Sequence, residues 1–364
     1  METSYAFLTQ SYTCYDNCAF CCLCEPEIPT EELPEFLGDA ELKAHLLRKF
    51  VDGEYKYVIK MRNRHGACIF LQHRRCTIYN KRPLYCRLYP LQRHLSTRLQ
   101  ITANLSCRGM WAEQGEPIEK IAQRFALSEK YSTVIEHLNE RYTSAREDME
   151  FTNTYISQEM CQKIVNALLK LFTTKEGLAK ILTFADNNEN PVAEEDEIKT
   201  CKADVDVDEY ATKMSIDVFS ENELLNLPVY PTPAFEWFVL RHENSRLNWY
   251  IMDEEGNLRH VKSVENFEQL KPLSAEAQSL MEQYLELLNA RDITYGNALL
   301  LTESSEYEIP VISNYLGALA TSCLELWWRA NLFAVKEVDV GAMREGIIFY
   351  DADYLDKPTY GAVL

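Results

Sequence analysis

The chain has 364 residues and a formal net charge of −19. No segment contains the roughly 18 consecutive apolar residues that a membrane-spanning helix needs, which argues against a membrane protein. Residues 1–13 also lack the basic start and continuous apolar run of a secretion signal. We therefore expect a cytoplasmic protein whose twelve cysteines are not a disulfide scaffold, because such scaffolds belong to short secreted chains.

The predicted elements mix helices and strands along the chain. Helix-start residues at 29–33 and apolar spacing through 42–50 predict a first helical region, and alternation at 55–61 predicts a strand. Further helices are expected at 119–141, 157–172, 178–184, 275–290 and 312–332. Further strands are expected at 237–240, 249–252, 258–261 and 346–350, with a hairpin turn at 254–257.

Charge divides the chain into two parts. Residues 1–150 carry 20 basic and 20 acidic side chains, whereas residues 151–364 carry 17 basic and 36 acidic ones. The acidic run at 187–209 is typical of a solvated linker. We predict an α+β protein with a Cys-rich metal-binding domain at 1–115, a helical extension at 116–185, an acidic linker at 186–212 and a mixed helix and strand domain at 213–364. The acidic second part is a candidate surface for a protein partner or substrate.

Nine of the twelve cysteines lie in the first 107 residues. The first group is Cys14, Cys18, Cys21 and Cys22. On an α-helix their spacing would place all four thiols on one stripe, and we interpret Cys24, at the edge of that stripe, as a spare. Buried apolar packing is the alternative, but a second group downstream favours metal or redox chemistry in a reducing compartment.

The second group is Cys68, Cys76, Cys86 and Cys107, and it lies in a basic stretch. Between Glu54 and Glu113 there are twelve Lys or Arg residues and no acidic residue. Nearby cations favour deprotonated cysteine and offset the negative charge of several thiolates. A nucleic-acid surface is the alternative, but the basic residues are interleaved with the cysteines and no nucleic-acid module accompanies them. We therefore expect no nucleic-acid partner.

Three motifs around the second group resemble the CxxCxxCC or YkgJ-type family of cysteine-cluster proteins. They are Gly66-Ala67-Cys68-Ile69-Phe70-Leu71, Cys76-Thr77-Ile78-Tyr79-Asn80-Lys81-Arg82-Pro83 and Cys86-Arg87-Leu88-Tyr89-Pro90. The resemblance extends to Cys18, Cys21, Cys22 and Cys107-Arg108-Gly109, and it implies a zinc- or iron-chelating domain in the first third of the chain. This sequence departs from the family pattern in the spacing of Cys14 and Cys18 and in Arg108, which replaces a proline. Independently of the resemblance, Pro83 and Pro90 predict rigid bends on both sides of Cys86.

The predicted metal ligands are eight cysteines: Cys14, Cys18, Cys21, Cys22, Cys68, Cys76, Cys86 and Cys107. Eight thiolates could form two tetrahedral zinc sites, two cubane iron–sulfur clusters, or one cluster with spare thiols beside it. The paired Cys-x2-Cys knuckles of a zinc ribbon are missing from the sequence, which favours a [4Fe–4S] cluster over zinc. His65, His73 and His94 are secondary candidates as ligands.

These observations predict a cytoplasmic metal-binding protein that acts in electron transfer or on a partner protein. The alternative is an S-adenosylmethionine-dependent protein-lysine methyltransferase, because the flagellin lysine methylases resemble this family in joining a cysteine cluster to a longer, partly helical chain. No glycine-rich strand-to-helix turn supports that cofactor. Cys14-x3-Cys18-x2-Cys21 also has the form of the radical S-adenosylmethionine motif, but the repeated strand–helix units of that superfamily's barrel are not recognised. No catalytic residue is identified from the sequence.

Overall fold

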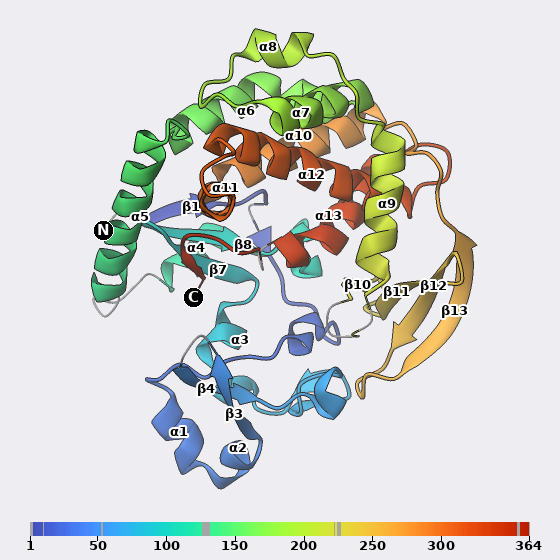
Figure 1. The fold of residues 1–364 in the computed structure, drawn as a ribbon. Helices are drawn as coiled ribbons and strands as arrows, with labels where there is room; N and C mark the ends of the chain where they lie inside the picture. The colour runs from blue at the N-terminus through green and yellow to red at the C-terminus, as the bar shows by residue number, and fades with distance from the viewer. Residues whose placement is uncertain are drawn as a thin grey trace.

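The computed structural model describes residues 3–9, 11–51, 54–125, 132–221, 223, 227–354 and 357–363. The protein is α+β, as predicted, with a body of packed helices, two four-stranded sheets and a smaller cysteine-rich arm (Figure 1). None of the helices in the described ranges combines the length and the apolar character needed to cross a membrane.

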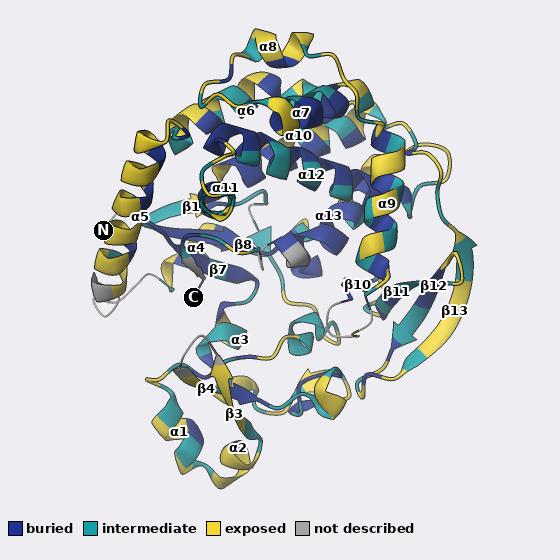
Figure 2. Ribbon diagram, viewed as in Figure 1, coloured by how far each residue is buried: buried dark blue, intermediate teal, exposed yellow. Residues whose placement is uncertain are grey.

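Helix α12 (Val311–Asn331) runs through the centre of the helical body. It packs against α7 (Lys175–Asn187), α11 (Asp292–Ser304) and α13 (Val340–Tyr354). The remaining helices of the body are α5 (Ser132–Phe151), α6 (Gln158–Phe172), α8 (Glu195–Thr200), α9 (Val207–Phe219) and α10 (Ala275–Ala290). Figure 2 shows α12 as largely buried and α8 as largely exposed. Helices from both sides of the acidic run therefore share one hydrophobic core.

The first sheet brings the two ends of the chain together. Its strand order is β1 (Thr3–Ala6), β8 (Leu99–Ala103), β7 (Leu91–Leu95) and β14 (Ala362–Val363), and β1 runs parallel to β8 while the other neighbours are antiparallel. A buried ion pair, Arg291–Asp351 at 2.7 Å, contacts this sheet, because Arg291 also donates to the carbonyl of Ala103 in β8 at 3.0 Å. Asp351 in turn accepts a hydrogen bond from the Leu105 amide at 2.5 Å. The segment after β8 is thus anchored to helix α13.

The second sheet is an antiparallel meander in chain order: β10 (Val229–Pro231), β11 (Trp237–Glu243), β12 (Arg246–Met252) and β13 (Leu258–Glu265). The strands predicted at 237–240, 249–252 and 258–261 are confirmed. The predicted turn between β12 and β13 is also confirmed, and Gly256 has a φ of +84°, which glycine adopts without strain.

The cysteine-rich arm consists of short elements around a small core of its own. It extends from the helical body at the bottom of Figure 1. Its elements are α1 (Leu33–Gly38), α2 (Ala40–Ala44), β3 (Leu46–Val51), β4 (Glu54–Ile59), β5 (Leu71–Gln72), β6 (Arg75–Cys76) and α3 (Leu84–Leu88). The chain passes through β2 (Ser11–Tyr12) before the arm and through β9 (Glu116–Pro117) after it, and these two strands pair with each other. Helix α4 (Ile118–Gln123) follows β9.

Several predicted elements differ from the structure. The helix predicted through Phe50 ends at Ala44, because residues 46–51 pair with β4 as a strand. The strand predicted at 346–350 is part of α13; its apolar run is buried among helices, and such short runs do not distinguish strand from helix. The helix predicted at 119–141 is represented by α4 and the start of α5, with residues 126–131 outside the described ranges. The acidic run, expected as a linker, contains α8 and the start of α9.

Candidate metal centre

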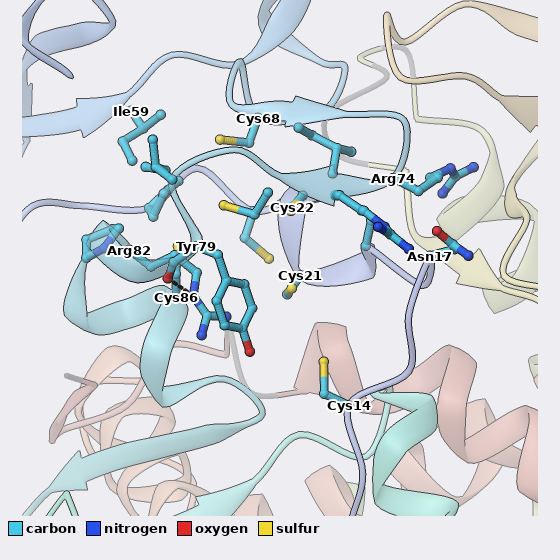
Figure 3. Close-up of a pocket in the computed structure, with 18 of the residues that line it drawn as sticks. Cys14, Asn17, Cys21, Cys22, Ile59, Cys68, Arg74, Tyr79, Arg82 and Cys86 are labelled. Atoms are coloured by element: carbon cyan, nitrogen blue, oxygen red, sulfur yellow. Dashed lines mark hydrogen bonds between the residues drawn. The ribbon is translucent and has the colours of Figure 1, made fainter. Parts of the chain in front are cut away.

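Seven cysteines line one cavity of about 400 Å³ in the cysteine-rich region, and Arg74, which also lines it, lies against Trp237 of the second sheet. They are Cys14, Cys21, Cys22, Cys24, Cys68, Cys76 and Cys86. Figure 3 shows the labelled cysteines among them arranged around the cavity, on segments that are far apart in the sequence. Cys18 and Cys107, two of the eight predicted ligands, do not line the cavity, whereas Cys24, which we interpreted as a spare, does.

The first cysteine group does not lie on an α-helix, so the predicted helical stripe is wrong. Asn17 and Ala19 have left-handed backbone conformations, with φ of 65° and 51°, and these interrupt any helix before Cys21. Only a short 3-10 helix, η1 (Phe20–Leu23), forms. The thiols of Cys21 and Cys22 are neighbours that shift each other's pKa, that of Cys21 downward and that of Cys22 upward. An irregular loop, and not a helical stripe, therefore brings these thiols to the cavity.

The second group reaches the cavity from three further elements. The amide of Cys68 donates to the carbonyl of Cys22 at 2.8 Å, which connects the two cysteine groups through the backbone. Cys76 lies on β6, where it pairs with Leu71 of β5. Cys86 lies in α3, a helix that Pro83 precedes at the N-cap position with an extended conformation. The rigid bend predicted before Cys86 is thus the start of this short helix.

Gly66 explains why the loop that carries Cys68 needs a glycine. A Cβ at this position would lie 2.6 Å from the carbonyl carbon of Glu255, which is far too close for non-bonded atoms. The turn between β12 and β13 packs directly on this loop, and the amide of Ala67 donates to the carbonyl of Glu254 at 2.9 Å. The second sheet therefore supports the cysteine loop, a relationship that the sequence patterns did not reveal.

Five thiols around the cavity influence one another electrostatically, and we call them the cavity group: Cys21, Cys22, Cys68, Cys76 and Cys86. Burial raises the pKa of Cys68 to about 11, and the thiols of Cys76 and Cys21 add to that rise. Burial likewise raises the pKa of Cys86, with further increases from Cys21, Cys68 and Cys76. The hydrogen bond from Cys22 lowers the pKa of Cys21. These mutual effects are those of thiols gathered in one place, where metal binding would have to displace protons.

Three other cysteines form a second set that we call the Cys107 group: Cys14, Cys18 and Cys107. Burial raises the pKa of Cys107, and the thiols of Cys18, Cys21 and Cys14 raise it further. Burial also raises the pKa of Cys18, with contributions from Cys21 and Cys14. Cys21, a member of the cavity group, thus also interacts electrostatically with the Cys107 group.

The basic residues of the arm are used in different ways. Arg74, Arg75 and Arg82 line the cavity, and the positive charge of Arg82 opposes the rise in pKa of Cys76 and Cys86. The guanidinium carbon of Arg82 also lies 3.7 Å from the centre of the Tyr79 ring. Arg62 forms an ion pair with Glu255 at 2.6 Å. Only part of the basic stretch therefore faces the thiols; Arg62 instead connects the arm to the second sheet, and Arg98 pairs with Asp292 in the helical body.

The thiols fit a thiophilic metal by their chemistry, since zinc and iron–sulfur clusters are bound by thiolates. Within the described part of the chain, no three Cys, His, Asp or Glu side chains are already arranged as a metal site, so side-chain rotation would have to bring sulfurs together. His65, His73 and His94 do not line the cavity. His94 is buried in β7 and neither of its ring nitrogens has a hydrogen-bond partner in the structure.

Clustered thiols on a loop, a hairpin strand and a short helix around one cavity define a cysteine-cluster domain. Residues 13–108 match the model of the CxxCxxCC family, described as "Putative zinc- or iron-chelating domain". This match confirms the resemblance found in the motifs and includes all nine N-terminal cysteines. An uncharacterized protein of Methanocaldococcus jannaschii is 28% identical over 129 residues, which are 33% of this chain and 70% of that protein. No solved structure matches the chain.

Proposed function

We propose that the protein binds an iron–sulfur cluster in the cysteine cavity and uses it in electron transfer or in acting on a partner protein in the cytoplasm. The observation that carries this proposal is the gathering of seven thiols around one cavity. Thiolates are the usual ligands of iron–sulfur clusters. The match of residues 13–108 to a zinc- or iron-chelating family supports a metal in this position.

The electrostatic grouping suggests how eight ligands would divide. The ligands of a [4Fe–4S] cluster at the cavity would be Cys22, Cys68, Cys76 and Cys86. The pKa of Cys22 is raised mainly by its hydrogen bond with Cys21 and by burial, and the thiols of Cys68 and Cys76 raise it further. After burial, Cys21 raises the pKa of Cys18 and Cys107 as well as that of Cys68 and Cys86. We assign Cys21 to a second centre with Cys14, Cys18 and Cys107, because this division gives each centre four thiols. Cys24 would remain a spare thiol near the cavity.

Anaerobic purification followed by analysis of iron, zinc and acid-labile sulfide tests the proposal. We expect iron and sulfide in the protein, together with visible absorption that bleaches on reduction. A colourless protein with two zinc ions would contradict the cluster. The division into two sets of four thiols would in that case describe two tetrahedral zinc sites.

S-adenosylmethionine-dependent protein-lysine methyltransfer stays an alternative prediction. The cavity supports it only in having room for a small molecule, since about 400 Å³ lies within the range of ligand pockets. Calorimetry with S-adenosylmethionine on the metal-replete protein tests it, and an absence of binding would contradict it.

A further inference from the structure

Arg74 is held in an unusual backbone conformation at the edge of the cysteine cavity. It lies with His73 in the two-residue turn between β5 and β6, and the two residues have φ of 61° and 50°. Hairpin turns of this kind favour Asn-Gly, because left-handed conformations strain residues with larger side chains. The backbone amide of Arg74 donates to Oε1 of Glu254 at 2.9 Å. The second sheet therefore helps to hold this turn of the arm in place.

The guanidinium of Arg74 packs on one flat face and carries a buried nitrogen at its edge. Its carbon lies 3.6 Å from the centre of the Trp237 ring, a stacking contact that uses the face of the group. Its N–H donors lie in the plane of the group, so stacking leaves them available. Nη1 is buried and has no hydrogen-bond partner among the described residues. Buried donors are nearly always satisfied, so this nitrogen indicates a missing partner.

The surroundings of Arg74 favour a negatively charged partner. Arg74 lines the same cavity as the thiols, together with Arg75, Arg82 and Asn17, and Figure 3 shows Arg74 and Asn17 at one end of it. Among the described residues, Asp16 is the single acidic side chain that lines this cavity. Along the cavity lining, three arginines and an amide outnumber this carboxylate. Outside the lining, Glu254 and Glu236 oppose the lowering of the Arg74 pKa by burial, so two carboxylates already lie near this guanidinium.

We propose that the Arg74 end of the cavity binds an oxyanion, the carboxylate or phosphate group of a small molecule that lies beside the metal centre. The planar fork of arginine matches both groups. This inference rests on the proposed function in one respect, which is that a metal lies beside the oxyanion. The contact between Arg74 and the oxyanion does not depend on that metal. Compensation of thiolate charge alone would require only a nearby cation. It does not account for the buried, unpartnered Nη1 of an arginine whose backbone is strained in a tight turn.

Calorimetric titration of the metal-replete protein with inorganic phosphate and with acetate tests the proposal. Both titrations are made at constant ionic strength, with chloride as the reference anion. We expect saturable binding of at least one oxyanion and a loss of about tenfold in affinity for Arg74→Gln, because a charged hydrogen-bond donor is removed. Arg74→Lys should bind with intermediate affinity, since it keeps the charge without the fork. Arg64→Gln is the matched control, because Arg64 is exposed in the same arm and does not line the cavity.

The outcomes separate the oxyanion site from the metal site. Metal content is measured on every sample, and the wild-type titration is repeated on metal-free protein. The test of Arg74 therefore stays valid even when the protein proves to contain no metal. A preference for phosphate or for acetate would identify the class of ligand. Absence of saturable binding to both anions, or equal binding by wild type and Arg74→Gln, would overturn the proposal. If the Arg74→Gln protein loses its metal, the Arg74→Lys protein is compared with the wild type instead. An oxyanion affinity equal to that of the wild type in metal-replete Arg74→Lys protein would overturn the role of the planar guanidinium.

Discussion

Arg108 and Glu345 form an ion pair that joins the end of the cysteine region to helix α13. Nη1 of Arg108 donates to Oε1 of Glu345 at 2.8 Å, and the hydroxyl of Tyr230 donates to the other carboxylate oxygen at 2.6 Å. Both partners are mostly buried, with side-chain exposures of 9% and 13%. Arg108 directly follows Cys107, so this pair fixes one proposed ligand to the main core of the protein.

Removal of Arg108 should destabilise the whole protein. Arg108→Met leaves the carboxylate of Glu345 without its cation in a mostly buried place, and we expect a loss of about 3 kcal/mol in the free energy of unfolding. Urea unfolding measures the loss. Arg87→Met is the control, because the Arg87–Glu32 pair is more exposed and should contribute at most about 1 kcal/mol. Equal losses in the two variants would contradict a special role for the Arg108 pair.

Substitution of a cavity cysteine should remove metal without unfolding the helical body. In Cys86→Ser, a hydroxyl replaces a thiolate ligand, and we expect the apparent metal affinity to fall by at least about a hundredfold. Competition with a chromophoric chelator measures this change. Cys201→Ser serves as the control, because Cys201 lies between α8 and α9 and lines no part of the cysteine cavity. Unchanged metal affinity in Cys86→Ser would exclude Cys86 as a ligand.

The two cysteine groups should lose their metal separately. If Cys68 and Cys107 serve different centres, Cys68→Ser and Cys107→Ser should each retain about half of the wild-type metal, and the double variant should retain none. Cys24→Ser should retain the full amount. Metal analysis of proteins purified in parallel gives the ratios. Loss of all metal from either single variant would point instead to one shared centre.

Local signals predicted the elements whose ends are set by neighbouring residues. Helix α10 begins where expected because the hydroxyl of Ser274 accepts a hydrogen bond from the Ala277 amide at 3.2 Å. Such an N-cap depends only on residues that are close in the sequence. The turn between β12 and β13 was predictable for the same reason, since Gly256 supplies the left-handed conformation that the turn needs.

Contacts between distant segments could not be predicted in this way. The cysteine spacing predicted convergence, and six of the eight predicted cysteines line one cavity. It also suggested a helical stripe, whereas Asn17 and Ala19 adopt left-handed conformations. The packing of Gly66 on Glu255, and of Arg74 on Trp237, depends on how the second sheet meets the arm. No local pattern identifies the partner segments of these contacts. The glycine in the Cys68 motif is a signal that some backbone approaches closely, but it does not say which one.

His94 should make the protein less stable in mild acid. Burial lowers its pKa to about 4, below the ordinary value of about 6.5. Because the folded pKa is lowered, the contribution of neutral His94 is fully present above about pH 6.5 and is lost as the pH falls toward 4, where the unfolded chain binds a proton that the folded protein does not. Between pH 7 and 5 this loss amounts to about 2 kcal/mol.

Urea unfolding at pH 7 and pH 5 tests this prediction. His94→Leu removes the titrating group, so its free energy of unfolding should fall by about 2 kcal/mol less than that of the wild type over this interval. His137→Gln is the control, because the side chain of His137 is 76% exposed on α5 and its removal should leave the wild-type dependence on pH unchanged. Parallel losses in wild type and His94→Leu would show that other groups cause the acid sensitivity.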